Sequence, residues 1–224
     1  MTKLKVKLVT FASKEYEHGQ ILLEEIAKRS GWSYVSYNPK KLLEIDPLFD
    51  SRPMATIDRG FGLWSWKPAI ILHELGRLTE NQVLFYLDSG DLFLPNIVDV
   101  YQNQLNDSPF LLFEGGGTIR EYTKLSVLNY FGCNGYLKRN KRMVEAGASF
   151  WRNTPASRDF IEKWKSACQE YDLISDPSDD ELQHPNFISH RHDQSLLTLL
   201  SLQYGATIVK ASKRRSFQCN ISGG

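Results

Sequence analysis

The stretch Gln82–Asp91, "QVLFYLDSGD", is the part of the sequence that decides the fold class. Its first six residues are almost continuously apolar, which is typical of a strand buried on both faces of a parallel sheet. Its last four residues are polar and include a glycine, which is typical of a loop. Ligands of open α/β sheets bind beyond the carboxyl ends of the strands. We therefore expect Asp88 and Asp91, at the end of this strand, to lie at a ligand site.

Strand and helix patterns alternate on both sides of this stretch. We expect strands at 4–11, 33–37, 82–87, 110–113, 147–152 and 206–210, and helices at 14–29, 69–78, 95–105, 155–171 and 195–204. Segment 125–131 fits a helix or a strand, and the acidic segment 172–184 is expected to be an exposed loop. The alternation predicts an α/β sheet with helices on its faces.

Composition describes a folded chain without a broad charged surface. The 224 residues carry 27 Lys or Arg and 26 Asp or Glu, a net charge of +1, with 42% hydrophobic residues. Binding to a nucleic-acid backbone needs a clustered basic excess, so we expect no nucleic-acid partner. No repeat or long linker divides the chain, and residues 1–224 are expected to form a single domain, either a whole protein or one module of a longer one.

The cysteines and the apolar runs indicate a compartment. Three cysteines without a C-x-x-C pair predict neither a disulfide framework nor a zinc site, so a reducing cytoplasm is expected. No apolar run approaches the roughly 18 to 20 residues that a membrane helix needs. The basic run Lys138–Arg142 is expected to be a solvated face, with binding to a diphosphate or to an anionic lipid surface as the alternative.

Asp88 and Asp91 are the first candidates for chemistry. Gly90 lies between them and lets the loop fold so that both carboxylates face one point. Hard oxygen ligands of this kind suit Mg²⁺ or Mn²⁺. The alternative is that Asp88 only ends the strand and Asp91 caps the next helix, since aspartate is common in turns.

The segment "RGFGLWSWKP" at 59–68 is a second candidate. Its glycines permit close approach of the backbone, and its aromatic rings offer stacking surfaces. Arg59 and Lys67 could neutralise a phosphate at the N-terminus of a helix that begins at Pro68. The alternative is a loop that Trp64 and Trp66 pin to the core.

The segment "HRHDQS" at 190–195 is a third candidate, because it places acid, base and donor groups just before an apolar helix. Asp193 could act in chemistry there or simply cap the helix. His190 or His192 could complete a metal site or assist proton transfer. The glycine run at 115–117 does not follow the first strand, as a nucleotidyltransferase loop would, and is expected to be a flexible loop and a candidate lid.

Four segments taken together resemble the GT-A class of nucleotide-sugar glycosyltransferases, particularly small capsule-type and viral members. The segments are "RGFGLWSWKP" at 59–68, "YLDSGD" at 86–91, "EAGASFWRN" at 145–153 and "HDQSL" at 192–196. The resemblance implies a Rossmann-like, mixed and mostly parallel sheet with helices on both faces. It also implies metal-dependent transfer of a sugar from a nucleoside-diphosphate sugar, with UDP as the expected nucleotide, to a hydroxyl of a glycan or another acceptor.

The resemblance also implies roles for individual residues. Donor-binding positions are expected at Thr10, Phe11, Ala12, Arg59, Trp66, Lys67, Asp88 and Ser89. A Mn²⁺ or Mg²⁺ ion is expected on Asp88 and Asp91, and acceptor-side positions are expected at Gly147 and Gln194. Asp193 is expected to be the base if the transfer inverts the anomeric configuration, or to orient or stabilise the developing cation if the configuration is retained. Arg59 and Lys67 would assist departure of the diphosphate as fixed cations.

Two questions stay open at this stage. The sequence reads D-S-G-D where the family has D-x-D, so Asp88 could ligate the metal or mainly contact the ribose. The alternative functions are a sugar-phosphate nucleotidyltransferase and a non-catalytic module that binds a sugar nucleotide. A single sequence does not determine the donor sugar, the acceptor, the stereochemistry or the oligomeric state.

Overall fold

A computed structural model describes residues 4–79, 81–92, 96–139 and 141–210 and contains one six-stranded sheet. The strands are β1 (Lys5–Phe11), β2 (Ser33–Tyr37), β3 (Gln82–Leu87), β4 (Phe110–Thr118), β5 (Arg142–Arg152) and β6 (Thr207–Val209). Their order is β2-β1-β3-β5-β4-β6. Only β5 runs against its neighbours, β3 and β4, while the other pairs are parallel. The predicted mixed, mostly parallel sheet is confirmed.

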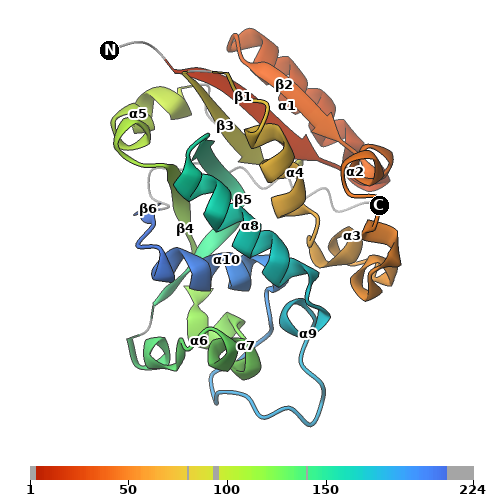
Figure 1. The fold of residues 1–224 in the computed structure, drawn as a ribbon, viewed down its shortest axis with the longest axis vertical. Coiled ribbons are helices and arrows are strands. Elements are labelled where there is room, and N and C mark those ends of the chain that lie inside the picture. The colour runs from red at the N-terminus through yellow and green to blue at the C-terminus, as the bar shows by residue number, and fades with distance from the viewer. Residues whose placement is uncertain (1–3, 80, 93–95, 140, 211–224) are drawn as a thin grey trace.

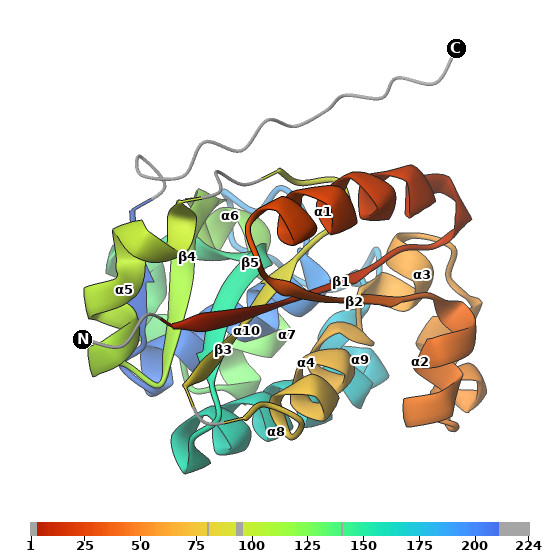
Figure 2. The same ribbon diagram turned by 90° about the horizontal axis from the view of Figure 1, so that it is seen from above.

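Helices cover both faces of this sheet, as predicted (Figures 1 and 2). The helices are α1 (Glu17–Arg29), α2 (Pro39–Ile45), α3 (Gly60–Leu63), α4 (Lys67–Leu75), α5 (Ile97–Asp107), α6 (Ile119–Tyr122), α7 (Leu125–Tyr130), α8 (Pro155–Gln169), α9 (Tyr171–Ile174) and α10 (His192–Gln203). Four 3-10 turns are η1 (Lys14–Tyr16), η2 (Phe49–Ser51), η3 (Pro53–Thr56) and η4 (Asn134–Arg139). Helices α1 and α5 pack on one face of the sheet, and α4, α8 and α10 pack on the other.

The central strand β3 explains why the sheet forms where it does. Its residues from Val83 to Leu87 are all buried. Alternate side chains enter the two different cores, with Phe85 on the α1 and α5 side and Tyr86 on the α4 and α8 side. A fully buried large apolar side chain stabilises the fold by about 1.5–3 kcal/mol relative to exposure. A strand with this pattern is stable only between two helical layers.

Two segments differ from the sequence predictions, and the structure resolves one that was ambiguous. The glycine run at 115–117, expected to be a flexible loop, belongs to β4, because β5 pairs with the residues on either side of it, Glu114 and Thr118, across a register irregularity. The acidic segment expected to be a loop from 172 onward begins with one helical turn, α9. The ambiguous segment 125–131 is helical as α7. The predicted helix start at Pro95 lies outside the described residues.

In the described ranges no helix combines the length and the apolar character that crossing a bilayer requires.

Candidate active site

A cleft of about 750 Å³ lies at the carboxyl ends of β1 and β3, where the sequence analysis expected a ligand. It is much larger than a water site and large enough for a nucleotide-sized ligand. Predicted site residues at its wall are Phe11, Ala12, Arg59, Trp66, Asp88, Ser89 and Asp91. Chain segments far apart in sequence therefore meet at this edge of the sheet.

Asp88 is held in place from two sides. The Tyr86 hydroxyl donates a hydrogen bond of 2.6 Å to Oδ1 of Asp88. The Lys67 ammonium lies 3.2 Å from Oδ1 and 3.3 Å from Oδ2 of the same carboxylate. The backbone N–H of Asp91 donates to the carbonyl of Asp88 at 3.0 Å, which closes a tight turn. These contacts fix both the side chain of Asp88 and the start of the loop that carries Asp91.

Gly147 of β5 lies directly against both carboxylates. A methyl group at Gly147 would lie 3.0 Å from Oδ2 of Asp88 and 3.0 Å from Oδ2 of Asp91. Both oxygens therefore border the same space, which only a residue without a side chain leaves open. The backbone supports this approach, because the N–H of Asp88 donates to the carbonyl of Gly147 at 2.8 Å.

The pair of oxygens fits a hard divalent cation. Mg²⁺ is usually held by one or two protein carboxylates, with phosphate and water oxygens completing its shell. Among the described residues no group of three or more His, Cys, Asp or Glu side chains could hold a metal ion. Asp88 and Asp91 would therefore hold an ion together with oxygens of a bound phosphate.

Lys67 is a buried cation behind the cleft. Its side chain is 2% exposed, and its ammonium contacts Oδ2 of Asp193 at 3.3 Å and donates to the carbonyl of Ala146 at 3.2 Å, besides its contacts to Asp88. Burial alone would lower the pKa of Lys67, but Asp193 and Asp88 outweigh burial and raise it above its ordinary value. The ammonium stays charged, and it lies below Asp88 and not among the residues that line the cleft.

Asp193 is not the helix cap that was one alternative in the sequence analysis. Helix α10 begins one residue earlier, at His192, and its N-cap is Arg191. Asp193 therefore lies in the first turn, is 3% exposed, and receives a hydrogen bond of 3.0 Å on its main-chain carbonyl from the Trp164 indole. Burial raises the pKa of Asp193 to about 6, although Lys67 opposes this shift.

The segment 59–66 both lines the cleft and packs on the core. The Trp66 ring stacks on Phe11 at 3.9 Å between centroids, and its indole N–H donates to the carbonyl of Gly60 at 3.1 Å. A side chain on Gly60 would meet the Trp64 ring at 2.3 Å, so this position requires glycine. The segment can therefore be held to the core by its aromatic rings and still form part of a binding site.

The same segment is strained and carries one exposed cation. Phe61, Leu63 and Trp64 all have positive φ angles, which are uncommon for residues other than glycine and cluster at functional sites. Arg59 is half exposed at the cleft wall and lies 3.7 Å from Asp176. Of the two predicted cations, only Arg59 faces the cleft directly.

The remaining predicted residues are more peripheral. Thr10 is fully buried beneath the end of β1 and does not line the cleft. Gln194 lies beside Gly115 of β4, where its Nε2 would be 3.0 Å from an added methyl group. His190 and His192 contact the carbonyls of Leu173 at 3.0 Å and of Ile174 at 2.7 Å, so they hold the end of α9.

Both histidines are neutral. Burial lowers the pKa of His190 well below its ordinary value, with His192 nearby acting in the same direction. Burial also lowers the pKa of His192. Neither side chain lines the cleft, and their contacts with Leu173 and Ile174 join the end of α9 to the start of α10.

Several residues at the site were given no role from the sequence. Tyr86 was quoted only as the first residue of "YLDSGD", although its position two residues before Asp88 puts both side chains on one face of the strand. Besides Asp88 and Asp91, the carboxylates of Glu15, Asp58 and Glu145 line the cleft, and Glu145 comes from β5. It was quoted within "EAGASFWRN", but only the antiparallel pairing of β5 with β3 brings it to this edge.

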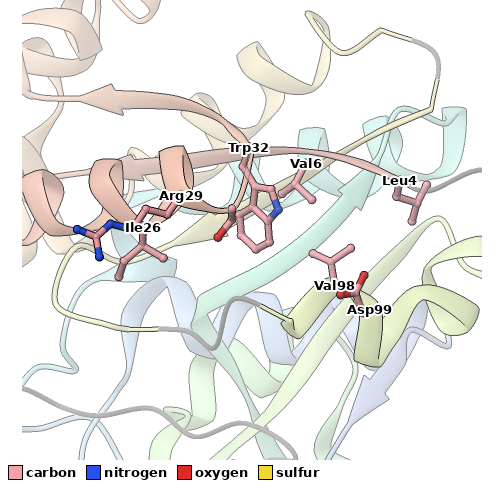
Figure 3. A pocket seen from close by; sticks show the side chains of 8 residues that line it. Leu4, Val6, Ile26, Arg29, Trp32, Val98 and Asp99 are labelled. Carbon is pink, nitrogen blue, oxygen red and sulfur yellow. The ribbon is translucent and has the colours of Figure 1, made fainter.

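A second hollow of about 370 Å³ lies at the opposite, amino edge of the sheet (Figure 3). Its wall is mainly apolar, with Val6, Trp32 and Val98, and it carries two charged residues, Arg29 and Asp99. Arg29 already pairs with Glu25 at 2.8 Å. This hollow lacks converging carboxylates and has half the volume of the cleft.

Comparison with known proteins identifies the fold. No protein-family model and no curated protein matches this sequence. A crystal structure of a glycosyltransferase involved in the glycosylation of the major capsid of PBCV-1 matches 92% of this chain and 81% of its own, with a TM-score of 0.53 and 12% identity. The WbbM bifunctional glycosyltransferase matches 93% of this chain and 39% of its own, with a TM-score of 0.51 and 8% identity. The chain has the GT-A fold of these glycosyltransferases.

Proposed function

We propose that the protein is a metal-dependent glycosyltransferase that transfers a sugar from a nucleoside-diphosphate sugar, with UDP as the expected nucleotide, to a hydroxyl of a glycan or another acceptor. The observation that carries the proposal is the placement of two Oδ2 atoms, from Asp88 and Asp91, around the open space above Gly147. This space lies at the cleft on the carboxyl edge of a GT-A sheet. A Mn²⁺ or Mg²⁺ ion bound there would neutralise the diphosphate leaving group.

The donor would lie along the ends of β1 and β3. Phe11, Ala12 and Ser89 line this part of the cleft and are proposed to contact the base and ribose, while Thr10 supports them from below. Trp66 is proposed to form the adjoining wall. These positions follow the resemblance and are consistent with the cleft in the structure.

The two cations have different proposed roles. Arg59 faces the cleft and would contact the diphosphate as a fixed positive charge. Lys67 is buried behind Asp88 and is bonded to it, so it would act through Asp88 by holding that carboxylate charged and oriented. Lys67 is therefore a positioning residue in this proposal.

Asp193 is proposed as the base that accepts the proton of the acceptor hydroxyl, although it is 3% exposed and, like Lys67, is not among the residues that line the cleft. Efficient general bases have pKa values near the operating pH, and burial raises the pKa of Asp193 to about 6. Lys67, at 3.3 Å, would orient the carboxylate. Gln194 follows Asp193 on α10 and, with Gly147, is proposed to border the acceptor side. Glu145 is the competing carboxylate, because it lines the cleft directly.

The proposed partners are a nucleotide sugar and a glycan or other hydroxyl acceptor, without a nucleic acid. The cytoplasm is the proposed compartment, because Cys133 and Cys168 are free and buried thiols, and burial raises the pKa of both. Such thiols are typical of a reducing environment.

Calorimetric titration tests the proposal directly. Nucleoside diphosphates and their sugar conjugates are titrated into the protein with and without Mn²⁺, and the Asp91→Asn variant serves as the matched control. We expect binding of a nucleoside diphosphate that requires Mn²⁺ and is lost in the variant. If none of these ligands binds with or without metal, the proposal is wrong.

Product analysis separates the alternative functions. The proposed enzyme releases a nucleoside diphosphate from a sugar nucleotide, whereas a nucleotidyltransferase releases pyrophosphate from a nucleoside triphosphate. A non-catalytic module would bind the sugar nucleotide without releasing either product. Release of pyrophosphate, or binding without turnover across a panel of hydroxyl acceptors, would replace the proposed function by the corresponding alternative.

A further inference from the structure

The first turn of α1 touches the turn that carries the two cleft aspartates. A methyl group at Gly19 of α1 would overlap the carbonyl oxygen of Ser89 and would lie 2.9 Å from the carbonyl carbon of the same residue. A main-chain carbonyl cannot turn aside as the end of a flexible side chain can, so this contact leaves no room for a side chain. Helix α1 therefore rests directly on the backbone between Asp88 and Asp91.

Gly19 lies on the face of α1 that packs against the sheet. Leu23 and Ala27 follow it at intervals of four residues, and both are fully buried in the core that α1 shares with β3. Within a helix, alanine is a more favourable residue than glycine. The close contact with Ser89, and not the helix itself, therefore requires glycine at this position.

Hydrogen bonds to β2 oppose any movement of α1 away from the turn. The Tyr34 hydroxyl donates to the carbonyl of Gln20 at 2.9 Å, and Nε2 of Gln20 donates to the carbonyl of Tyr37 at 2.8 Å. Both bonds fix the residue that follows Gly19 in the chain. A side chain at Gly19 would therefore displace Ser89 more readily than it would displace α1.

The turn is also held from the side of β5. The N–H of Asp88 donates to the carbonyl of Gly147 at 2.8 Å, and a methyl group at Gly147 would crowd the carboxylates of Asp88 and Asp91. The N–H of Asp91 donates to the carbonyl of Asp88 at 3.0 Å. Because Ser89 follows Asp88 directly, a displacement of Ser89 changes the place of Asp91 relative to Asp88.

Gly90, to which the sequence analysis attributed the folding of this turn, is not restrained in the same way. It does not have a positive φ angle, and a methyl group at Gly90 would meet no atom beyond its chain neighbours within 4 Å. A side chain at Gly90 is therefore compatible with the turn. The contacts that require glycine at this turn come instead from other elements, at Gly19 of α1 and Gly147 of β5.

We propose that Gly19 is a positioning residue for the metal site in the cleft. It lets α1 fix the backbone of Ser89, and this fixes the place of the Asp91 carboxylate relative to that of Asp88. Groups that orient metal ligands without touching the ion typically change metal affinity about 10- to 100-fold. The role toward the metal rests on the proposed function, whereas the support of the turn does not depend on it.

Amide hydrogen exchange of the metal-free protein tests the support of the turn. We expect the protection factor of the Asp91 N–H to fall about ten-fold in Gly19→Ala, because displacement of the turn weakens its bond to the Asp88 carbonyl. Two controls, Gly90→Ala in the same turn and His18→Ala at an exposed position beside Gly19, should keep the wild-type protection. Equal protection in Gly19→Ala and wild type would show that α1 does not hold the turn and would overturn the proposal.

Titration of Mn²⁺ in the presence of a nucleoside diphosphate, followed by the electron paramagnetic resonance signal of the free ion, tests the role toward the metal. Gly19→Ala should weaken Mn²⁺ binding about 10- to 100-fold, and Gly90→Ala should stay within about two-fold of wild type. If wild type and Gly19→Ala bind Mn²⁺ equally, Gly19 does not position the metal ligands and the proposal is wrong. If wild type binds no Mn²⁺ with any nucleoside diphosphate, the proposed function is wrong, and the exchange result then assigns Gly19 to the support of the turn alone.

A second variant decides the question if circular dichroism shows that Gly19→Ala does not fold. Tyr34→Phe/Gln20→Ala removes both hydrogen bonds that tie the start of α1 to β2 and leaves Gly19 in place. We expect the protection factor of the Asp91 N–H to fall about three-fold or more, because α1 can then move away from the turn. The control Glu25→Ala breaks an exposed ion pair on the same helix and should leave this protection unchanged. Wild-type protection in Tyr34→Phe/Gln20→Ala would contradict the support of the turn by α1 and overturn the proposal.

Discussion

Two hollows lie at opposite edges of the same sheet and differ in chemistry. The carboxyl-edge cleft is about 750 Å³ and presents Asp88 and Asp91 over Gly147. The amino-edge hollow is about 370 Å³, and its charges are one arginine and one aspartate, Arg29 and Asp99. A cavity alone therefore does not make a metal or nucleotide site. The cleft is distinguished by carboxylates that buried groups hold at one point.

The two hollows differ in chemistry because different side chains lie behind their walls. Behind the cleft, Lys67 compensates Asp88 at the cleft wall and Asp193 in the protein interior, where an unpaired charge is costly. At the amino edge, Arg29 pairs with Glu25 on its own helix in an exposed ion pair, which contributes little. Variants at the two edges should therefore have very different effects.

The largest effect is expected for Asp91→Asn in the cleft. Loss of one of two carboxylates should weaken the metal's stabilisation of the leaving group, and we expect kcat/KM to fall by about 1,000-fold or more. Steady-state kinetics with a saturating acceptor measures this. Thermal unfolding should remain close to wild type, and near-normal turnover would remove Asp91 from the metal site.

Lys67→Met tests the contribution of the buried ammonium behind the cleft. Removal of the cation leaves Asp193 buried without a counter-charge and takes from Asp88, which is 35% exposed at the cleft, its fixed partner; the loss at Asp193 should destabilise the fold by about 3–5 kcal/mol. Urea unfolding measures the change. Lys163→Met, which breaks an exposed pair with Asp159, is the control and should change stability within error. Equal losses in the free energy of unfolding for the two variants would contradict the stabilising role given to Lys67.

Asp193 is expected to control the pH dependence of turnover. Because burial raises its pKa to about 6, the base form is lost below that pH, and kcat/KM should fall about ten-fold per pH unit there and level off above it. Asp193→Asn should lower kcat at least about 100-fold and abolish this limb. If Glu145→Gln abolishes the limb and Asp193→Asn does not, Glu145 is the base.

Gly147→Ala should have a smaller effect. The added methyl group would lie 3.0 Å from two carboxylate oxygens and displace them slightly, so metal-dependent donor affinity should fall about ten-fold. Titration of a nucleoside diphosphate with Mn²⁺ measures it. Gly135→Ala, where a methyl group meets nothing within 4 Å, should bind like wild type.

The smallest effect is expected at the amino edge. Asp99→Asn is the counterpart of Asp91→Asn and should leave kcat/KM within about two-fold of wild type, because surface substitutions away from a site are nearly neutral. The same kinetic assay measures both variants. A loss comparable to that of Asp91→Asn would mean that the two edges do not differ as proposed.

The local pattern of the sequence was sufficient for most elements. Strand β3 was expected at 82–87 and is found at Gln82–Leu87. A continuous apolar run of this length, bounded by polar loop residues, is typical of a buried strand. The length of β4 was missed because Gly115–Gly117 has low strand propensity. The pairing of β4 with β5 compensates for this low propensity, and local composition does not reveal pairing with a strand that is distant in sequence.

The sequence by itself determined the α/β class and the position of Asp88 and Asp91 at the end of a buried strand. Only the tertiary structure decided that Asp88 and Asp193 meet at the buried ammonium of Lys67 and that Gly147 leaves space beside the carboxylates of Asp88 and Asp91. The physical reason is that periodicity depends on neighbours in sequence. Burial, charge compensation and the pKa of a side chain depend instead on neighbours in space, which strand order and helix packing bring together.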